Sequence, residues 1–297
     1  MATTQNRTGG LLASGLAYLC WGFMPVYWTL LSPARSWEVI AHRIVWSLLV
    51  LLMLLLAFGR KRELASAFRE IRTNGRLFLI LAAAAASAGV NWWINVLAAH
   101  VDRVIELGIG MFLTPLLSVA IGCVFFRERL SGLRRIALLL AASGVAALAF
   151  NYGAVPWVAI GVSSTWAFYG ALKKLVPLSP WASNTFECIL MLPFALAYLS
   201  VLNLNGLSTF GPDDPGISLA LAGTGIVTLI PMVAFAYAAQ NLPLYLLGFS
   251  QFLNPVLTIA VGVFVLGEPF NSAFALPLAA IVLAAAVFIA AELKDRK

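Results

Sequence analysis

The feature that most constrains this chain is a series of apolar runs, each about 20 residues long, separated by short polar or basic stretches. An α-helix needs about 20 apolar residues to cross the hydrocarbon core of a bilayer. The sequence therefore predicts an all-α polytopic membrane protein with ten transmembrane helices. These are expected at residues 9–31, 37–58, 77–99, 104–126, 136–151, 155–175, 180–202, 217–239, 244–266 and 272–291.

The composition excludes the common soluble classes. Hydrophobic residues make up 62% of the chain and charged residues only 10%, whereas a soluble domain has about 45–50% apolar and about 25% charged residues. A soluble enzyme and a nucleic-acid-binding protein are therefore excluded. We expect the lipid bilayer and a small-molecule substrate as partners, and no nucleic acid. The three cysteines lie in apolar runs without metal-ligand spacing, so no metal and no cofactor are expected.

The basic residues predict the orientation in the membrane. With the N-terminus in the cytoplasm, 16 of the 19 Lys and Arg residues fall in cytoplasmic segments. Arg35 and Arg103 lie outside, and Arg43 lies within a span. Lys and Arg concentrate in cytoplasmic loops because their translocation is unfavourable. This distribution favours ten spans with both termini cytoplasmic.

An internal repeat relates two stretches of the chain. Residues 107–130 and 247–270 align without gaps at an offset of 140. The identical positions are Leu107, Gly108, Phe112, Leu113, Pro115, Leu117, Ala120, Gly122 and Glu128. The two stretches are the fourth and ninth predicted spans, so the second copy crosses the membrane in the opposite direction. We expect two inverted five-helix repeats, 1–151 and 152–297, that form one membrane domain.

Inverted repeats are a recurrent plan of secondary transporters, in which the substrate site lies between the halves near mid-membrane. Exchange of conformation between the halves would open such a site to alternate sides. Proline removes a helical hydrogen bond and glycine allows close helix contact, so hinges are predicted at matched positions of the repeat. These hinge positions are Gly108, Pro115, Gly248 and Pro255. A monomer suffices for this mechanism.

Several motifs resemble the drug/metabolite transporter superfamily. They are EVIAHRIVWS at 38–47, NW at 91–92, AFYG at 167–170, GIVT at 225–228 and GFSQFLNP at 248–255. The resemblance is to the EamA-type branch that includes RarD-like proteins and the YddG-like amino-acid exporters, and it covers about residues 9–291. It implies ten helices arranged as five plus five, and export of small metabolites or drugs across the bacterial inner membrane. For YddG-like members it implies that the exported substrates are aromatic and other neutral amino acids.

Aromatic and amide side chains within the spans are the candidate substrate-binding residues. Aromatic faces can stack on an apolar side chain or hold an ammonium group, and amides can hydrogen-bond a zwitterion without adding net charge. Packing between helices is the alternative role for the same residues. The set comprises Tyr18, Trp21, Asn91, Trp92, Asn95, Trp166, Tyr169, Tyr237, Gln251 and Asn254.

Ionisable residues in or near a bilayer usually face a cavity or a partner. The candidates for gating or coupling are Glu38, His42, Arg43, Glu106 and Glu187. Glu38 and His42 are expected on one helix face together with Trp46. His42 and Arg43 could form an outer gate, a carboxylate-recognising site or a salt-bridged anchor. In the repeat register Arg43 corresponds to Glu187, so these two could pair or act as complementary gates, and Glu106 is another possible partner of Arg43.

The sequence thus predicts a secondary transporter, not an enzyme, that exports neutral, aromatic or hydrophobic amino acids and related metabolites by alternating access. The carrier alternative is an exporter of amphipathic drugs or other metabolites. A membrane enzyme would need a nucleophile–base pair or a metal set, and a sensor would need an effector domain; neither is found in the sequence. Without an ATP-binding motif, facilitated diffusion and proton antiport both remain open.

Overall fold

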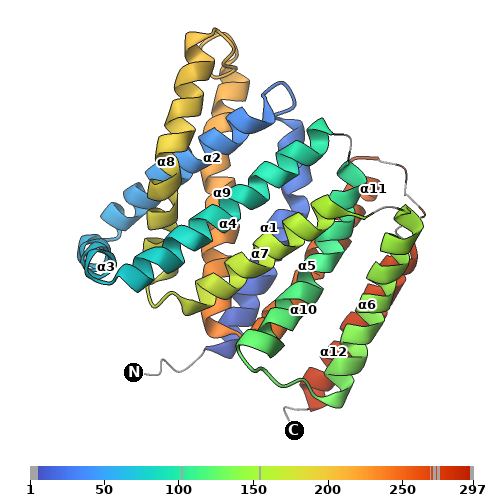
Figure 1. Cartoon of the computed structure of the whole chain (residues 1–297). Coiled ribbons are helices and arrows are strands. Elements are labelled where there is room, and N and C mark those ends of the chain that lie inside the picture. The colour runs from blue at the N-terminus through green and yellow to red at the C-terminus, as the bar shows by residue number, and fades with distance from the viewer. Residues whose placement is uncertain are drawn as a thin grey trace.

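The computed structural model describes residues 6–101, 103–153, 155–267, 269, 272 and 275–294. Within these ranges the chain is helical, and the helices are joined by short connections (Figure 1). The helices are α1 (Arg7–Thr29), α2 (Ser36–Ala57), α3 (Lys61–Thr73), α4 (Gly75–His100), α5 (Val104–Phe125), α6 (Gly132–Tyr152), α7 (Trp157–Leu175), α8 (Pro180–Leu204), α9 (Pro215–Asn241), α10 (Leu244–Gln251), α11 (Leu253–Phe264) and α12 (Ala275–Lys294).

Most of these helices are long and apolar enough to cross a membrane, which confirms an all-α polytopic membrane protein. Nine candidate spans are found in the described part of the chain, with α10 and α11 together forming one of them. The sequence predicted ten. The missing one is α7, which carries Ser163, Ser164, Thr165, Lys173 and Lys174 and is therefore less apolar. Even so, α7 packs along α4 and α5 inside the bundle (Figure 1).

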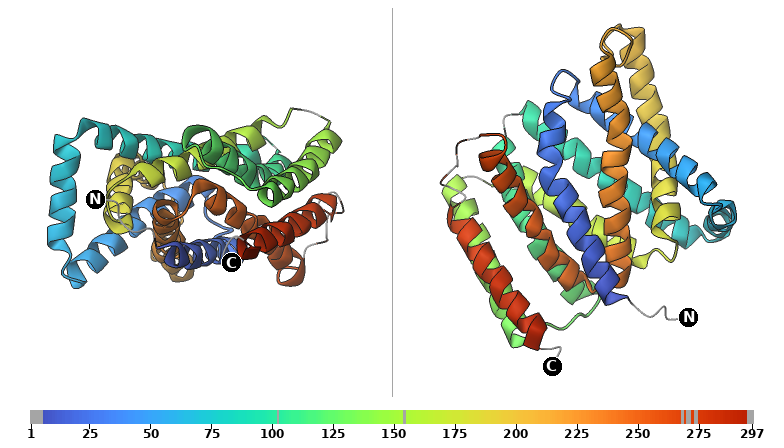
Figure 2. Two further views of the ribbon diagram at one scale, coloured as in Figure 1. Left: turned by 90° about the horizontal axis from the view of Figure 1, so that it is seen from below. Right: turned by 180° about the vertical axis from the view of Figure 1, so that it is seen from behind.

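The basic segment between the second and third predicted spans is a helix, whereas the sequence analysis assigned it to a loop. Helix α3 is amphipathic: Ala67 and Ile71 are buried, and its Arg and Lys side chains are exposed. The buried face packs against Leu77, Leu178 and Phe186 of neighbouring segments. Helix α3 lies across the ends of α2 and α4 rather than parallel to them (Figure 2).

The ninth predicted span, 244–266, is broken into two helices. Helix α10 ends at Gln251 and α11 begins at Leu253, with Phe252 between them. Pro255 is the third residue of α11. Proline cannot donate its backbone hydrogen bond to the preceding turn, which accounts for a break here. Helix α5 carries the matching Pro115 and continues through it without interruption.

The helices pack in a pattern that is repeated between the two halves of the chain. Helix α1 contacts α9 and α11, and α7 in the same way contacts α4 and α5. Helix α2 pairs with α8, α5 with α10, and α6 with α12. Both termini lie at the same end of the bundle, opposite the α1–α2 and α8–α9 connections (Figures 1 and 2).

Helices α2 and α9 approach closely at a glycine. A Cβ atom added to Gly225 would lie 2.5 Å from the backbone carbon of Trp46 and 2.7 Å from its carbonyl oxygen. The backbone oxygen of Gly225 also accepts a hydrogen bond from the Ser47 hydroxyl at 3.2 Å. This contact fixes the distance between α2 and α9, and it thereby positions the α2 side chains described below.

Candidate functional site

A cavity of about 610 Å³ lies between α1, α2, α4, α5, α7 and the α10–α11 pair. Small-molecule sites commonly have volumes of about 300–1,000 Å³. Eight of the ten candidate substrate-binding residues line this cavity: Tyr18, Trp21, Asn91, Trp92, Asn95, Trp166, Gln251 and Asn254. The same pocket therefore collects side chains from both halves of the sequence.

The cavity extends toward the end of the bundle opposite the termini. Its lining includes Ser32 and Ala34 of the α1–α2 connection and Ser36 at the start of α2. In the other direction its lining ends near Tyr18, which is only 2% exposed. The cavity is thus a recess that begins at one end of the bundle and ends in its middle.

The floor of the recess is a layer of aromatic rings. The Trp21 and Trp166 rings are 5.3 Å apart in an edge-to-face arrangement, and Trp166 lies 5.4 Å from Phe235. Tyr18 lies 5.5 Å from Trp21, and Tyr169 stacks on Phe235 at 5.7 Å. Ring separations of 4.5–7 Å are favourable for aromatic pairs. This layer separates the recess from the end of the bundle that holds the termini.

Amide side chains hold the cavity walls together. Asn91 Nδ2 of α4 donates to the Val162 carbonyl at 2.8 Å and to Thr165 Oγ1 at 3.0 Å, both on α7. Gln251 Nε2 of α10 donates to Ser118 Oγ of α5 at 3.1 Å. Each amide therefore joins one helix from each half of the chain. It also presents polar atoms at the cavity wall, where a zwitterion could exchange hydrogen bonds with it.

Two candidate residues do not line the cavity. Tyr169 is fully buried beneath Trp166, and its hydroxyl donates to Glu187 Oε2 at 3.1 Å. Tyr237 is half-buried near the C-terminal end of α9, where its carbonyl accepts from Asn241. Tyr169 lies three residues beyond Trp166 toward the C-terminal end of α7, and none of the described residues of α9 lines the cavity.

Sequence reasoning missed several lining residues, including Met24, Trp28, Met111, Thr114 and Thr258. The repeat offset of 140 could have found two of them, because it relates Met111 and Thr114 to the candidates Gln251 and Asn254. Trp28 gave no such signal, because it lies at the end of the first apolar run, where tryptophan is common at the membrane interface.

Arg43 lies at the cavity wall and is held by aromatic rings and a hydroxyl. Its guanidinium carbon lies 4.6 Å from the centre of the Trp92 ring and 5.4 Å from that of Trp28. Its Nε donates to Thr228 Oγ1 of α9 at 3.0 Å. No carboxylate of the described residues forms an ion pair with it, so neither Glu187 nor Glu106 is the direct partner that the sequence suggested.

Glu38 and His42 do lie on one face of α2 with Trp46, but this face meets the α8–α9 connection and not the cavity. Glu38 Oε1 accepts from the Ser208 hydroxyl at 3.0 Å and from the Thr209 backbone N–H at 2.8 Å. The His42 ring lies 4.8 Å from that of Phe210 and accepts at Nδ1 from Trp46 Nε1 at 3.1 Å. These residues therefore anchor the connection to α2.

The other two carboxylates each have a different basic partner. Glu106 accepts from Arg103 Nη1 at 2.7 Å, from the Tyr152 hydroxyl at 2.8 Å and from the backbone N–H of Val158 at 2.8 Å. It thereby joins the start of α5 to the end of α6 and the start of α7.

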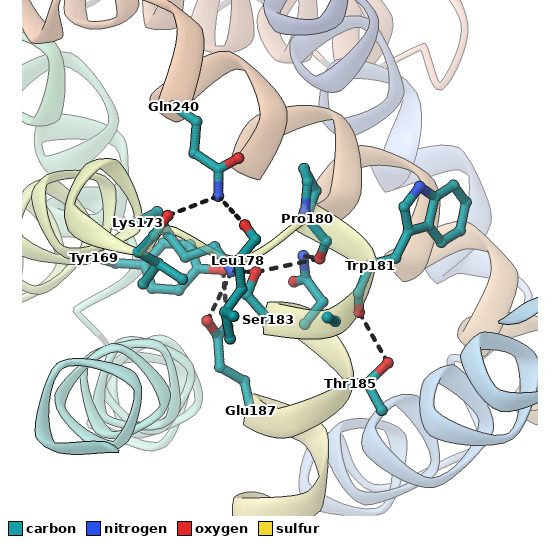
Figure 3. Close-up of polar contacts among 12 residues, drawn as sticks. Tyr169, Lys173, Leu178, Pro180, Trp181, Ser183, Thr185, Glu187 and Gln240 are labelled. Atoms are coloured by element: carbon teal, nitrogen blue, oxygen red, sulfur yellow. Dashed lines mark hydrogen bonds and ion pairs between the residues drawn. The ribbon is translucent and has the colours of Figure 1, made fainter. Parts of the chain in front are cut away.

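Glu187 forms a buried ion pair with Lys173. Lys173 Nζ lies 2.7 Å from Glu187 Oε1 and also donates to Ser183 Oγ at 2.8 Å (Figure 3). Arg43 and Glu187 both border a second, small cavity of about 30 Å³, so they face a shared space without touching.

Polar contacts close the end of the bundle that holds the termini. The Glu128 carboxylate accepts from the backbone N–H groups of Leu244 and Tyr245, at 2.7 and 2.8 Å, where α10 begins. Lys174 Nζ donates to the Leu242 carbonyl at 2.6 Å. Glu268, the repeat counterpart of Glu128, lies outside the described residues. A further network joins three helices through Arg134, Arg7 and Glu292.

Two of the four hinge candidates, Gly248 and Pro115, meet at one helix contact. A Cβ atom added to Gly248 of α10 would lie 2.9 Å from Val119 Cγ2 and 3.0 Å from the Pro115 carbonyl oxygen of α5. The absence of a side chain at Gly248 therefore lets α10 lie against the turn of α5 that contains Pro115. Pro255 adjoins the α10–α11 break, and Gly108 lies in the second turn of α5.

Within the described residues, no three His, Cys, Asp or Glu side chains are grouped so that they could hold a metal ion. The chemistry of the cavity is thus that of indole faces, amides, hydroxyls and one guanidinium. Such groups can bind and orient a small amphipathic molecule, and none of them forms a nucleophile–base pair.

Comparisons with known proteins show that the chain is similar to membrane transporters. The pattern of the EamA-like transporter family matches residues 154–290. The chain is 37% identical to "Protein RarD" of Streptomyces exfoliatus over 95% of its length and 89% of that protein's. It is 32% identical to "Uncharacterized transporter YojE" of Bacillus subtilis, over 97% and 96%.

A third relative, the "Chloramphenicol-sensitive protein RarD" of Pseudomonas aeruginosa, is 30% identical over 88% of this chain and 87% of its own length. A crystal structure of a protein with 18% identity superposes with a TM-score of 0.74 and covers 95% of this chain and 97% of that one. This last similarity shows that the fold is shared.

Proposed function

This chain belongs to the EamA-like transporter family, together with the RarD proteins, and from this premise we propose that it is a secondary carrier that exports neutral, aromatic or hydrophobic amino acids and related metabolites. It is a membrane transporter and not an enzyme. The observation that carries the proposed substrate class is the composition of the cavity, in which Trp21, Trp28, Trp92 and Trp166 surround a volume suited to one small molecule.

The substrate class follows from the chemistry of the cavity wall. Indole faces stack on an aromatic or aliphatic side chain and attract an ammonium group. Asn91, Asn95 and Asn254 add hydrogen-bonding groups without charge. Arg43 is the one basic side chain in the lining, so the site does not suit a polyanion. A small zwitterion with an apolar side chain matches these groups.

Ten spans arranged as two inverted repeats, 1–151 and 152–297, are the architecture we propose. The packing supports it, because α1 contacts α9 and α11 as α7 contacts α4 and α5. The cavity supports it too, since repeat-related positions such as Trp21 and Trp166, or Thr114 and Asn254, all line it. Helix α7 serves as the tenth span, because its polar residues face other helices.

We place the termini in the cytoplasm of a bacterial cell, with the protein in its inner membrane. The basic side chains of α3 and of the α5–α6 connection then lie on the cytoplasmic side, as Lys and Arg usually do. In this orientation the recess opens outward, and the aromatic layer with the Glu128 and Lys173 contacts closes the inner side. One chain holds the complete cavity, so a monomer is sufficient.

Alternating access would require the two halves to exchange their packing. The aromatic layer between Trp21 and Trp166 would part, and the walls near the α1–α2 connection would close. The contact of Gly248 with the Pro115 turn, together with the α10–α11 break, provides the place where α10 could move against α5. We propose Gly108, Pro115, Gly248 and Pro255 as the hinge of this movement.

Export of an amphipathic drug is the second candidate. It is favoured by the apolar share of the cavity and by the name of the Pseudomonas aeruginosa relative, which mentions sensitivity to chloramphenicol. Chloramphenicol is an uncharged aromatic compound, so indole faces could hold it without Arg43. The two candidates therefore differ in whether the transported molecule needs a carboxylate.

Uptake of radiolabelled phenylalanine into proteoliposomes tests the proposal, with protein-free vesicles as the control. We expect saturable uptake that unlabelled tryptophan or methionine suppresses. A second series with an imposed pH gradient separates proton antiport, which the gradient would accelerate, from facilitated diffusion, which it would leave unchanged. Saturable uptake of chloramphenicol without uptake of phenylalanine would support the drug exporter instead.

A further inference from the structure

We infer that Arg43 binds the carboxylate of the transported molecule, so that the carrier requires a carboxylate in its substrate. This inference rests on the proposed function and names the group of the substrate that the cavity recognises. It also assigns a role to the one guanidinium at the cavity wall.

The guanidinium is fixed in place but its hydrogen-bonding capacity is not used. Only Nε has a hydrogen-bond partner, Thr228 Oγ1, and the two Nη groups have none among the described residues. The faces of Trp28 and Trp92 hold the planar group at 5.4 and 4.6 Å. An arginine that is positioned in this way presents two parallel N–H donors, which match the two oxygens of a carboxylate.

The charge of Arg43 is also not neutralised by the protein. The nearby carboxylates are engaged elsewhere: Glu187 with Lys173, and Glu38 with the backbone and hydroxyls of the α8–α9 connection. A charged side chain within the bilayer is costly unless it has a partner or faces a water-filled cavity. The indole faces compensate in part. A bound carboxylate would supply the missing opposite charge.

The surroundings of Arg43 fit the remainder of such a molecule. Trp92 contacts the guanidinium and also lines the cavity, so an aromatic side chain of the substrate can lie beside the same ring. The side-chain oxygen of Asn95 can accept a hydrogen bond from an ammonium group, since its Nδ2 already donates to the Asn91 carbonyl at 2.8 Å. One end of the cavity thus recognises an anion and the rest recognises neutral or cationic groups.

The test compares three substrates in proteoliposomes: phenylalanine, its amide, which lacks the carboxylate, and N-acetylphenylalanine, which lacks the ammonium. The variants are Arg43→Gln and Arg43→Lys. Arg35→Gln is the matched control, because Arg35 is an exposed arginine near the same end of the bundle that does not line the cavity. Thermal unfolding of each purified variant verifies that it is folded.

We expect Arg43→Gln to raise the KM for phenylalanine and N-acetylphenylalanine about 10- to 100-fold, the range for loss of a hydrogen bond to a charged group. We expect the wild type to take up phenylalaninamide poorly, because it has no carboxylate, and Arg43→Gln to change this residual uptake less than about threefold. The KM of Arg43→Lys should be intermediate, because the lysine ammonium keeps the positive charge but lacks the two parallel N–H donors of arginine. Arg35→Gln should behave as the wild type.

Three results would overturn the inference. An unchanged KM for phenylalanine in Arg43→Gln would remove the role of Arg43 and leave the amino-acid carrier intact. The wild type could take up phenylalaninamide or chloramphenicol but neither phenylalanine nor N-acetylphenylalanine. This result would refute both the carboxylate requirement and the proposal that amino acids are the substrates. If the folded wild type carries none of these compounds, both proposals fail.

Discussion

Lys173 of α7 and Glu187 of α8 form an ion pair at 2.7 Å in which both side chains are buried, with 0% and 3% of their residue surfaces exposed. Hydrogen bonds from Tyr169 and to Ser183 satisfy the remaining polar atoms. The pair lies next to Tyr169, which belongs to the aromatic layer (Figure 3). The ion pair therefore joins α7 and α8 at the place where the bundle would have to part for the cavity to open inward.

Removal of one member of this pair should destabilise the protein strongly. A single Lys173→Met or Glu187→Leu change leaves an unpaired buried charge, which typically costs about 3–5 kcal/mol. The double variant replaces both charges with apolar groups and should recover most of the stability. Thermal unfolding of the purified proteins measures this. A double variant that is no more stable than the weaker single variant would contradict the assignment.

A second ion pair provides the control. Arg60 and Glu63 lie 3.5 Å apart and are partly exposed, and such pairs contribute about 0–1 kcal/mol. Arg60→Met should therefore leave the unfolding temperature almost unchanged.

Two adjacent tryptophans on α4 distinguish the cavity from the lipid-facing surface. Trp92 lines the cavity, whereas Trp93 is 48% exposed on another face of the helix. Trp92→Leu should raise the KM for phenylalanine roughly tenfold or more, because it removes an aromatic contact and a support of Arg43. Trp93→Leu should leave KM within about twofold, since lipid replaces its contacts. Equal effects of the two changes would argue against the cavity as the binding site.

The close approach of α2 and α9 predicts a packing defect. In Gly225→Ala the new methyl group would overlap the Trp46 backbone, and overpacking of this kind costs about 1–3 kcal/mol. The unfolding temperature should fall accordingly. Gly15→Ala in α1 is the matched control, because a Cβ there meets no atom within 4 Å. A stable Gly225→Ala variant would mean that α2 and α9 are further apart than described.

The hinge proposal predicts different effects for the two repeat-related prolines. Pro255→Ala supplies a backbone N–H that can bond toward Gln251 and extend the helix through the α10–α11 break. It should lower the turnover rate more than it changes KM. Pro115→Ala should have a smaller effect, since α5 is already continuous there. Unchanged turnover in both variants would exclude a hinge at these residues.

The membrane architecture was largely predictable, because each span is a long apolar run and its ends are marked by charge, Pro or Gly. Helix α3 was missed because its composition is basic. The spacing of Ala67 and Ile71 on one helix face was a usable sign of an amphipathic helix. The α10–α11 break was predictable only as a kink near Pro255, because the same proline motif in α5 leaves that helix intact.

Side-chain partners were much less predictable than the lining of the cavity. Eight of the ten aromatic and amide candidates line it, since polar groups within apolar spans tend to face the interior. The partner of Glu187 depends on how α7 and α8 are rotated against each other, which spacing within one helix does not determine. For that reason Lys173, which the sequence analysis counted among the basic residues of the cytoplasmic side, was not identified as its partner.

The central claim is that the recess is the substrate site and opens outward, and thiol labelling in intact cells tests it most directly. The variant Thr258→Cys places a thiol in the cavity, in a background where Cys20, Cys123 and Cys188 are replaced by Ala. Ser66→Cys, at an exposed position of α3, is the inward-facing control.

We predict that a membrane-impermeant maleimide labels Thr258→Cys from outside and that phenylalanine slows this labelling, whereas Ser66→Cys is labelled only after the membrane is permeabilised. Labelling of Thr258→Cys that requires permeabilisation, or that phenylalanine does not affect, would contradict the account.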